Sequence, residues 1–210
     1  MARKTPEESQ KTRDAILDAA EVVFLKKGVT HASMADIAEQ AGVSRGAVYG
    51  HYKNKMELGL AMCQRAFEAE DYWKEGKAVN VSPLERLRRQ HLFHMKQYCE
   101  SDTQRRVLEI LYTRCERTPE NDEMLRLKEQ FEKECEDDHM LLLNEAVSSG
   151  ELPRDLDVGL AFAFLNTMVC GQCSLLMCKE MTPEEFMLAL EPFLDASLDA
   201  MRHSLALRKR

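Results

Sequence analysis

A short stretch near the amino terminus carries side chains that could bind the phosphates and base edges of DNA. Arg45 has a planar guanidinium that suits guanine O6 and N7, a pairing that discriminates between bases by about 1–3 kcal/mol. Gly46 removes a side chain where a protein backbone could approach DNA closely. Hydroxyl, imidazole and ammonium groups that could donate to phosphates lie around them. The predicted DNA contacts are Ser33, Ser44, Arg45, Gly46, Tyr49, His51, Tyr52 and Lys55.

Two short helices are needed to position these side chains. Ser33 is an expected helix cap with Asp36 in the first turn, and the apolar residues that follow share one helical face, which predicts a helix over residues 34–41. Gly42 supplies a residue that ends this helix, and Ser44 caps a second one. The pattern predicts a helix-turn-helix whose second helix would enter the major groove.

Residues 33–55, SMADIAEQAGVSRGAVYGHYKNK, resemble the DNA-binding signature of the tetracycline-repressor (TetR) family. The opening residues 2–29 and the downstream motif ILYTRCE at 110–116 are similar to the multidrug-efflux subgroup of that family. The resemblance implies an all-α fold. It would comprise a three-helix DNA-binding head over residues 1–54 and a helical ligand-binding and dimerisation domain over residues 55–210.

The resemblance also implies a function. The chain is expected to be a ligand-responsive repressor that binds a palindromic double-stranded DNA operator as a homodimer and is released by hydrophobic small molecules, with an efflux pump gene as the target. One or two dimers per operator both stay open. The helix beginning at Lys55 is the expected lever, because it alone would connect head and body directly. The subgroup often has an aromatic residue where this chain has Gly50, so operator preference is expected to differ.

The charge distribution supports a basic head on an acidic body. The net charge is −7, yet residues 1–55 contain nine Lys/Arg against seven Asp/Glu, and the remaining residues contain twenty against twenty-nine. The head is therefore presented to DNA while the body is repelled from it. A charged amino terminus and the lack of a long continuous apolar run predict a cytoplasmic protein without a membrane span.

Proline and helix-capping residues divide the remainder into helices. Ser82-Pro83-Leu84-Glu85 and Thr182-Pro183-Glu184-Glu185 both combine a cap, a proline at the first helical position and a glutamate three residues after the cap. Pro192 is expected to kink or interrupt the last helix. The expected helices cover residues 10–27, 55–74, 83–100, 103–115, 119–149, 155–179 and 183–205.

The segment 158–177, VGLAFAFLNTMVCGQCSLLM, carries no charged side chain. A helix that is apolar all round must be covered on every side. A second subunit on one face would provide this cover and would hold two DNA-binding heads at a fixed separation. A helix buried wholly within one chain is the alternative.

The helices of the body are rich in methionine and aromatic residues, which can line an adaptable cavity for hydrophobic compounds. Most of these residues are expected to be ordinary core. Polar or polarizable groups on helices that resemble those lining the family's pocket are the predicted ligand contacts. They are Tyr112, Cys135, His139, Asn166 and Cys170.

Other chemistries find less support in the sequence. Cys170 and Cys173 have the spacing of a redox pair, so the same architecture could be a redox or electrophile sensor, but an apolar helix offers nothing that lowers a thiol pKa. The pair His91 and His94 has no identifiable third metal ligand, so no metal or other cofactor is expected. No phosphate loop or nucleophile motif indicates an enzyme. An architectural DNA-binding protein would need a more basic body.

Overall fold

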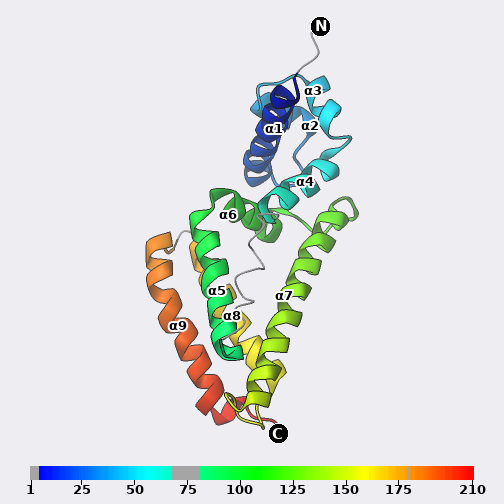
Figure 1. The fold of residues 1–210 in the computed structure, drawn as a ribbon. Coiled ribbons are helices and arrows are strands. Elements are labelled where there is room, and N and C mark those ends of the chain that lie inside the picture. Colours follow the sequence, from blue (N-terminus) through cyan, green and yellow to red (C-terminus); the bar gives the residue numbers. More distant parts are fainter. Residues whose placement is uncertain (1–4, 68–80, 179) are drawn as a thin grey trace. The chain divides into compact units, whose positions relative to one another are not determined.

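The computed structural model describes residues 5–67, 81–178 and 180–210 (Figure 1). These residues form helices, with one isolated antiparallel β-bridge between Leu156 and Arg208. The chain divides into two compact units. The first contains residues 1–69 and 101–130, and the second contains residues 70–100 and 131–210.

Three amino-terminal helices of the first unit form the predicted helix-turn-helix with its supporting helix. The first helix begins earlier than the expected residue 10, because Thr5 and Glu8 form a capping box around Pro6. This is the same start pattern that marks residues 82–85 and 182–185. Gly42 has φ 65° and ends the second helix as expected. The helices are α1 (Pro6–Lys27), α2 (Met34–Gln40) and α3 (Arg45–His51).

The first unit is completed by α4 and by a segment far along the chain. The α-helix expected over 103–115 ends at Glu109 and continues as one π-helical turn, and residues 68–74 of the helix expected over 55–74 lie outside the described part. Both α6 and the π-helix pack on α1, as α4 does. The expectation that α4 alone connects to the head is therefore wrong. The elements are α4 (Lys55–Phe67), α6 (Asp102–Glu109), the π-helix Ile110–Arg114, the 3-10 helix Pro119–Asn121 and the start of α7 (Asp122–Ser149).

The second unit consists of α5, the rest of α7, α8 and α9, with α9 packed on both α5 and α8. The last helix continues through Pro192, so the expected interruption is absent. The carbonyl of Leu188 loses its helical partner there, but Leu188 is 79% exposed and water can replace the missing donor. The elements are α5 (Pro83–Glu100), α8 (Val158–Met177), α9 (Pro183–His203) and the 3-10 helix Leu205–Leu207.

The apolar helix α8 is only partly covered by its own chain. Leu160 and Leu175 are 45% and 40% exposed, and 22% of its most apolar stretch is buried. In the described residues it is the one helix long and apolar enough to cross a membrane, although core helices of soluble proteins pass the same test. The exposed side of α8 is therefore an apolar surface of the kind that partner proteins contact.

Candidate DNA interface and ligand-binding residues

The outer face of α3 offers the chemistry predicted from the sequence. Val48 is fully buried and anchors the helix, while Ser44 Oγ accepts from the backbone N–H of Ala47 at 3.2 Å. Arg45 and Tyr49 remain exposed, Tyr49 by 56%. The helix thus presents a guanidinium and a phenol hydroxyl on a firmly seated backbone.

The predicted contact Ser33 is also a structural cap. Its hydroxyl accepts from the Asp36 backbone N–H at 3.2 Å and donates to Asp36 Oδ2 at 2.8 Å. Lys27, 2.8 Å from the same carboxylate, lowers the pKa of Asp36 together with Ser33. Asp36 therefore stays ionised and holds the start of α2.

Two predicted DNA contacts are engaged within the protein. Tyr52 is 3% exposed, and its hydroxyl accepts from Arg13 Nε at 3.1 Å. Lys55 Nζ donates to the Thr30 carbonyl at 3.0 Å and lies 3.0 Å from Glu120 Oε1. Their contact with DNA stays a prediction, and the structure gives both a role in holding the helix-turn-helix in shape. Tyr52 also lines a cleft of about 390 Å³, together with Arg13, His51, Asn54, Glu57, Leu60, Ala61, Gln64 and Glu123.

A buried carboxylate that the sequence reasoning missed ties three helices of the first unit together. Glu21 on α1 has no exposed area, and it accepts from Arg65 Nη2 of α4 at 2.5 Å and from Arg106 Nε of α6 at 2.7 Å. Its position on the apolar face of α1, between Leu17 and Phe24, could have identified it. A buried charge at such a position requires partners from packed elements.

The downstream motif 110–116 docks onto the turn that follows α1. The backbone N–H of Val29 donates to the Arg114 carbonyl at 2.8 Å, and Thr30 Oγ1 donates to Glu116 Oε2 at 2.6 Å. The Thr30 hydrogen bond is the main cause of the lowered Glu116 pKa. Arg114 and Glu116 of the motif therefore hold the turn after α1 in place, while Tyr112 of the same motif is 48% exposed and its contact with a ligand stays a prediction.

Imidazole rings from α5 and α7 form a buried cluster in the second unit. His91 and His139 stack with ring centroids 4.4 Å apart, and Phe162 of α8 lies 6.2 Å from His139. Burial lowers the pKa of His91 to about 4 and that of His139 to about 2. Both rings are therefore neutral at pH 7, and His94 beside them is also buried.

Four of the five predicted ligand contacts lie in the second unit, and the fifth, Tyr112, lies in the first. Cys135 Sγ lies 3.7 Å from His139 Nδ1, and Cys170 Sγ lies 3.6 Å from Asn166 Oδ1 on the exposed face of α8. Tyr112 belongs to the first unit, where Lys128 Nζ lies 4.1 Å from its ring centroid. The pairs on α7 and α8 share one unit, and Tyr112 does not.

Two thiols of the second unit, those of Cys135 and Cys173, are poorly suited to redox sensing. Burial raises the pKa of Cys173 to about 12 and that of Cys135 to about 11, so both are protonated at pH 7. Cys173 Sγ also lies 3.5 Å from Met95 Sδ, a packing contact. All seven cysteines are free, and the described residues contain no group suited to a metal ion.

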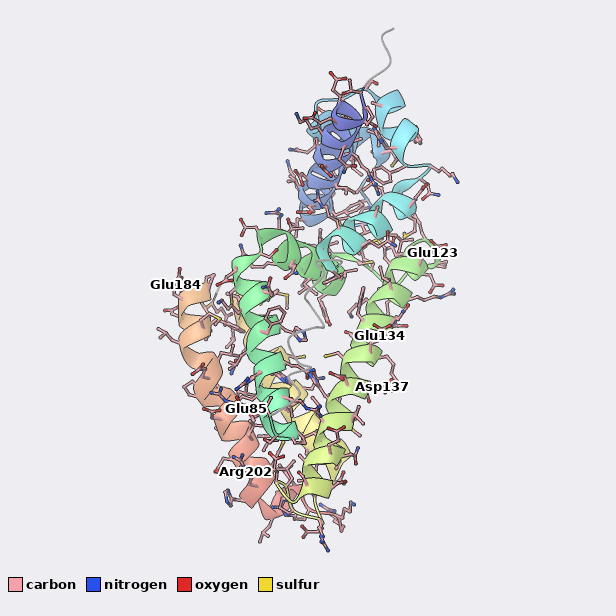
Figure 2. All side chains as sticks on the ribbon, in the orientation of Figure 1. Glu85, Glu123, Glu134, Asp137, Glu184 and Arg202 are labelled. Carbon is pink, nitrogen blue, oxygen red and sulfur yellow. The ribbon has the colours of Figure 1, made fainter. Side chains whose placement is uncertain are left out.

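A second cleft, of about 430 Å³, lies in the second unit near the start of α5 and the end of α9. Figure 2 labels Glu85 and Arg202, which lie at this end of the unit. Arg88 Nε donates to Asp195 Oδ1 at 2.7 Å within the cleft. This charged lining does not suit a hydrophobic ligand.

An exposed second helix in a helix-turn-helix, followed by a helical body, defines a helix-turn-helix transcriptional regulator. Residues 16–62 match "Bacterial regulatory proteins, tetR family", and residues 82–201 match "MAATS-type transcriptional repressor, C-terminal region". The chain belongs to the TetR family of transcriptional regulators. The predicted family, the all-α fold and the exclusion of an enzyme are thereby confirmed.

Relatives and solved structures extend the likeness over the whole chain. The HTH-type transcriptional regulator TtgR of Pseudomonas putida is 36% identical over 213 residues, covering 100% of both chains. The crystal structure of MexZ, described as a key repressor responsible for antibiotic resistance in Pseudomonas aeruginosa, has 45% identity and a TM-score of 0.86, covering 96% of this chain and 100% of that one. A SmeT–triclosan complex has 25% identity and a TM-score of 0.72, covering 93% of each chain.

Proposed function

We propose that this regulator is a repressor that binds a palindromic operator as a dimer and is released by hydrophobic small molecules. The exposed face of α3 is the observation that carries the operator assignment. In this proposal Arg45 reads base edges, and Ser44, Gly46, Tyr49 and His51 contact DNA beside it. Ser33, Tyr52 and Lys55 contact phosphates or stabilise the surface that contacts them. The DNA-binding domain ends at residue 54, and the ligand-binding and dimerisation domain begins at residue 55.

Base reading is tested by comparing two cations of equal charge. An operator is first selected by the protein from a pool of random DNA duplexes. Arg45→Ala is expected to abolish preference for that operator over scrambled DNA. Lys53→Ala, at an exposed position two residues after α3, should weaken binding to both and lower the salt slope by about one unit. Unchanged preference in Arg45→Ala would remove Arg45 from base reading.

The dimer in this proposal forms through α8 and α9. Supporting it, Leu160 on α8 and Phe193 on α9 are 45% and 43% exposed, leaving an apolar surface uncovered by the chain itself. Ala163 lies on the same exposed face of α8. An unpaired charge there cannot be desolvated without a large free-energy cost.

Sedimentation of charge variants tests the assembly. Ala163→Glu should convert a dimer into a monomer at micromolar concentration. Lys133→Glu, on the exposed side of α7, is the matched control and should leave the dimer intact. A wild-type protein that sediments as a monomer at that concentration contradicts the proposed assembly.

The inducer in this proposal is an apolar, uncharged compound bound in the carboxy-terminal domain. The neutral rings of His91 and His139 and the protonated thiol of Cys135 support it, because they provide polar atoms without a charge. SmeT, described as the repressor of a multidrug efflux pump, also has a solved complex with triclosan. Control of an efflux pump gene is proposed on that likeness.

Operator release with a ligand panel and with peroxide separates this inducer from a thiol switch. Apolar aromatic compounds should release the operator, and His139→Trp should shift their potency without changing affinity for DNA in their absence. Replacing Cys170 and Cys173 by serine should leave the response in place. Release by peroxide alone, lost in the serine variant, would make the cysteines the sensor.

A further inference from the structure

The recognition helix contains two glycines that the protein's own packing does not require. Gly46 and Gly50 both lie in α3, and neither has a positive φ. A Cβ added at Gly50 would meet nothing within 4 Å, and one added at Gly46 would meet only Ser44 Oγ at 3.9 Å. Alanine would therefore fit at both positions without strain.

Glycine inside a helix nevertheless weakens it, because the unfolded chain loses more conformational freedom on folding than it would with alanine. The helix has only seven residues, RGAVYGH, so two glycines lower its stability substantially. The atoms around the two positions in the described part of the protein leave room for a side chain at each. The packing of these residues therefore does not explain why both positions are glycine.

Both glycines face outward on the same side of the helix. They are exposed and four residues apart, a spacing that places them one above the other, and the exposed Tyr49 precedes Gly50. His51, whose imidazole could donate a hydrogen bond to a phosphate oxygen, follows Gly50. The surface at Gly50 is thus a gap between two groups suited to phosphate contact.

We propose that Gly50 is a close-approach position, where the missing side chain lets the sugar–phosphate backbone of the operator touch the backbone of α3. This inference rests on the proposed operator binding and extends the interface beyond the residues assigned to it. Gly50 sets how deeply the helix enters the groove, while Arg45 sets which bases are read, so this inference replaces the expectation that Gly50 changes operator preference. The two positions should therefore respond differently to substitution.

The test measures thermal unfolding and operator binding of Gly50→Ala. The melting temperature should rise by roughly 2–4 °C, as expected when a strain-free helical glycine becomes alanine in a chain of this size. Affinity for the operator selected by the wild type should fall by about tenfold or more, comparable to the loss of one base pair's contacts. The sequence selected from the random pool should stay the same.

Gly42→Ala provides the matched control for stability. Its Cβ would also meet nothing within 4 Å, but φ is 65°, so this variant should melt at a lower temperature than the wild type. Gly50→Trp should lose more operator affinity than Gly50→Ala, because the larger side chain holds the helix further from the groove.

Three results would overturn the inference. A lower melting temperature of Gly50→Ala would mean that the fold itself needs the glycine. Operator affinity within twofold of the wild type would mean that nothing approaches there, and an altered selected sequence would place base edges, not the sugar–phosphate backbone, at this position. A wild type that selects no sequence from the pool would contradict the proposed function instead.

Discussion

The two units bury polar groups in opposite ways. In the first, the Glu21 carboxylate lies among apolar side chains and accepts hydrogen bonds from Arg65 and Arg106. In the second, His91 and His139 stack without a charged partner and are neutral because burial lowers their pKa. The buried polar group of the first unit has cationic hydrogen-bond partners, whereas desolvation keeps the buried imidazoles of the second unit neutral.

This difference implies that the helices joined by Glu21 are held rigidly, whereas the side chains around the imidazole cluster can adapt. A buried ion pair with fixed geometry holds the helices that carry it, and breaking it leaves a charge without a partner. Neutral aromatic rings impose weaker directional constraints and can rearrange around an apolar guest. The ion pairs of Glu21 thus favour one fixed packing of the first unit, whereas the imidazole cluster could rearrange around an apolar compound, as the proposed function requires.

The largest expected effect comes from removing the buried carboxylate. Glu21→Ala should lower the free energy of unfolding by about 2–3 kcal/mol, below the value for fully buried pairs because Arg65 and Arg106 are partly exposed. Urea unfolding measures the change. Asp18→Ala is the control: Asp18 also contacts Arg65, at 2.8 Å, but is 67% exposed, so its loss should cost less than about 1 kcal/mol. Equal effects would contradict the role of Glu21.

The imidazole cluster should make stability depend on pH. The unfolded chain takes up protons as pH falls below the ordinary histidine pKa of 6.5, whereas His91 and His139 in the folded chain resist protonation to about pH 4 and about pH 2. Stability is therefore fully present above pH 6.5 and is lost as pH falls from there. Each histidine should lower the free energy of unfolding by roughly 1.4 kcal/mol between pH 7.5 and 5.5.

His139→Phe supplies the control for this pH dependence, because phenylalanine keeps the stack on His91 but cannot take up a proton. Urea unfolding at both pH values should show the loss reduced by about half. Asp36, Glu116 and Asp195 have lowered pKa values and titrate below this window. An undiminished loss in the variant would show that other groups cause it.

The smallest effect concerns how tightly α4 packs on the start of α7. A Cβ added at Gly59 would lie 2.6 Å from Met124 Sδ, and Met124 is fully buried. Because methionine is flexible, Gly59→Ala should lower the free energy of unfolding by only about 1–2 kcal/mol. Gly159→Ala on α8 meets its nearest atom at 3.6 Å and should not destabilise the protein. An unchanged free energy of unfolding in Gly59→Ala would show that the side chains of the first unit rearrange more easily than its ion pairs suggest.

Local sequence patterns were sufficient to predict most helices and the exposed face of α3. Capping residues at Ser33, Ser44 and Thr182 specify helix starts through contacts within a few residues, so the pattern of side chains alone predicts them. The start at Thr5 followed the same rule and was missed only because the apolar period begins later. The exposed face of α3 follows from the burial of Val48.

Packing between distant parts of the chain decided which buried polar groups pair, and the sequence alone did not predict these pairs. The partners of Glu21 lie 44 and 85 residues away, and Glu116 lies 86 residues from Thr30, so no local pattern connects them. Helix propensities and caps act over about one turn, so the sequence by itself determined where most helices begin. Which buried polar groups meet, and whether they are charged, depended on how the helices packed.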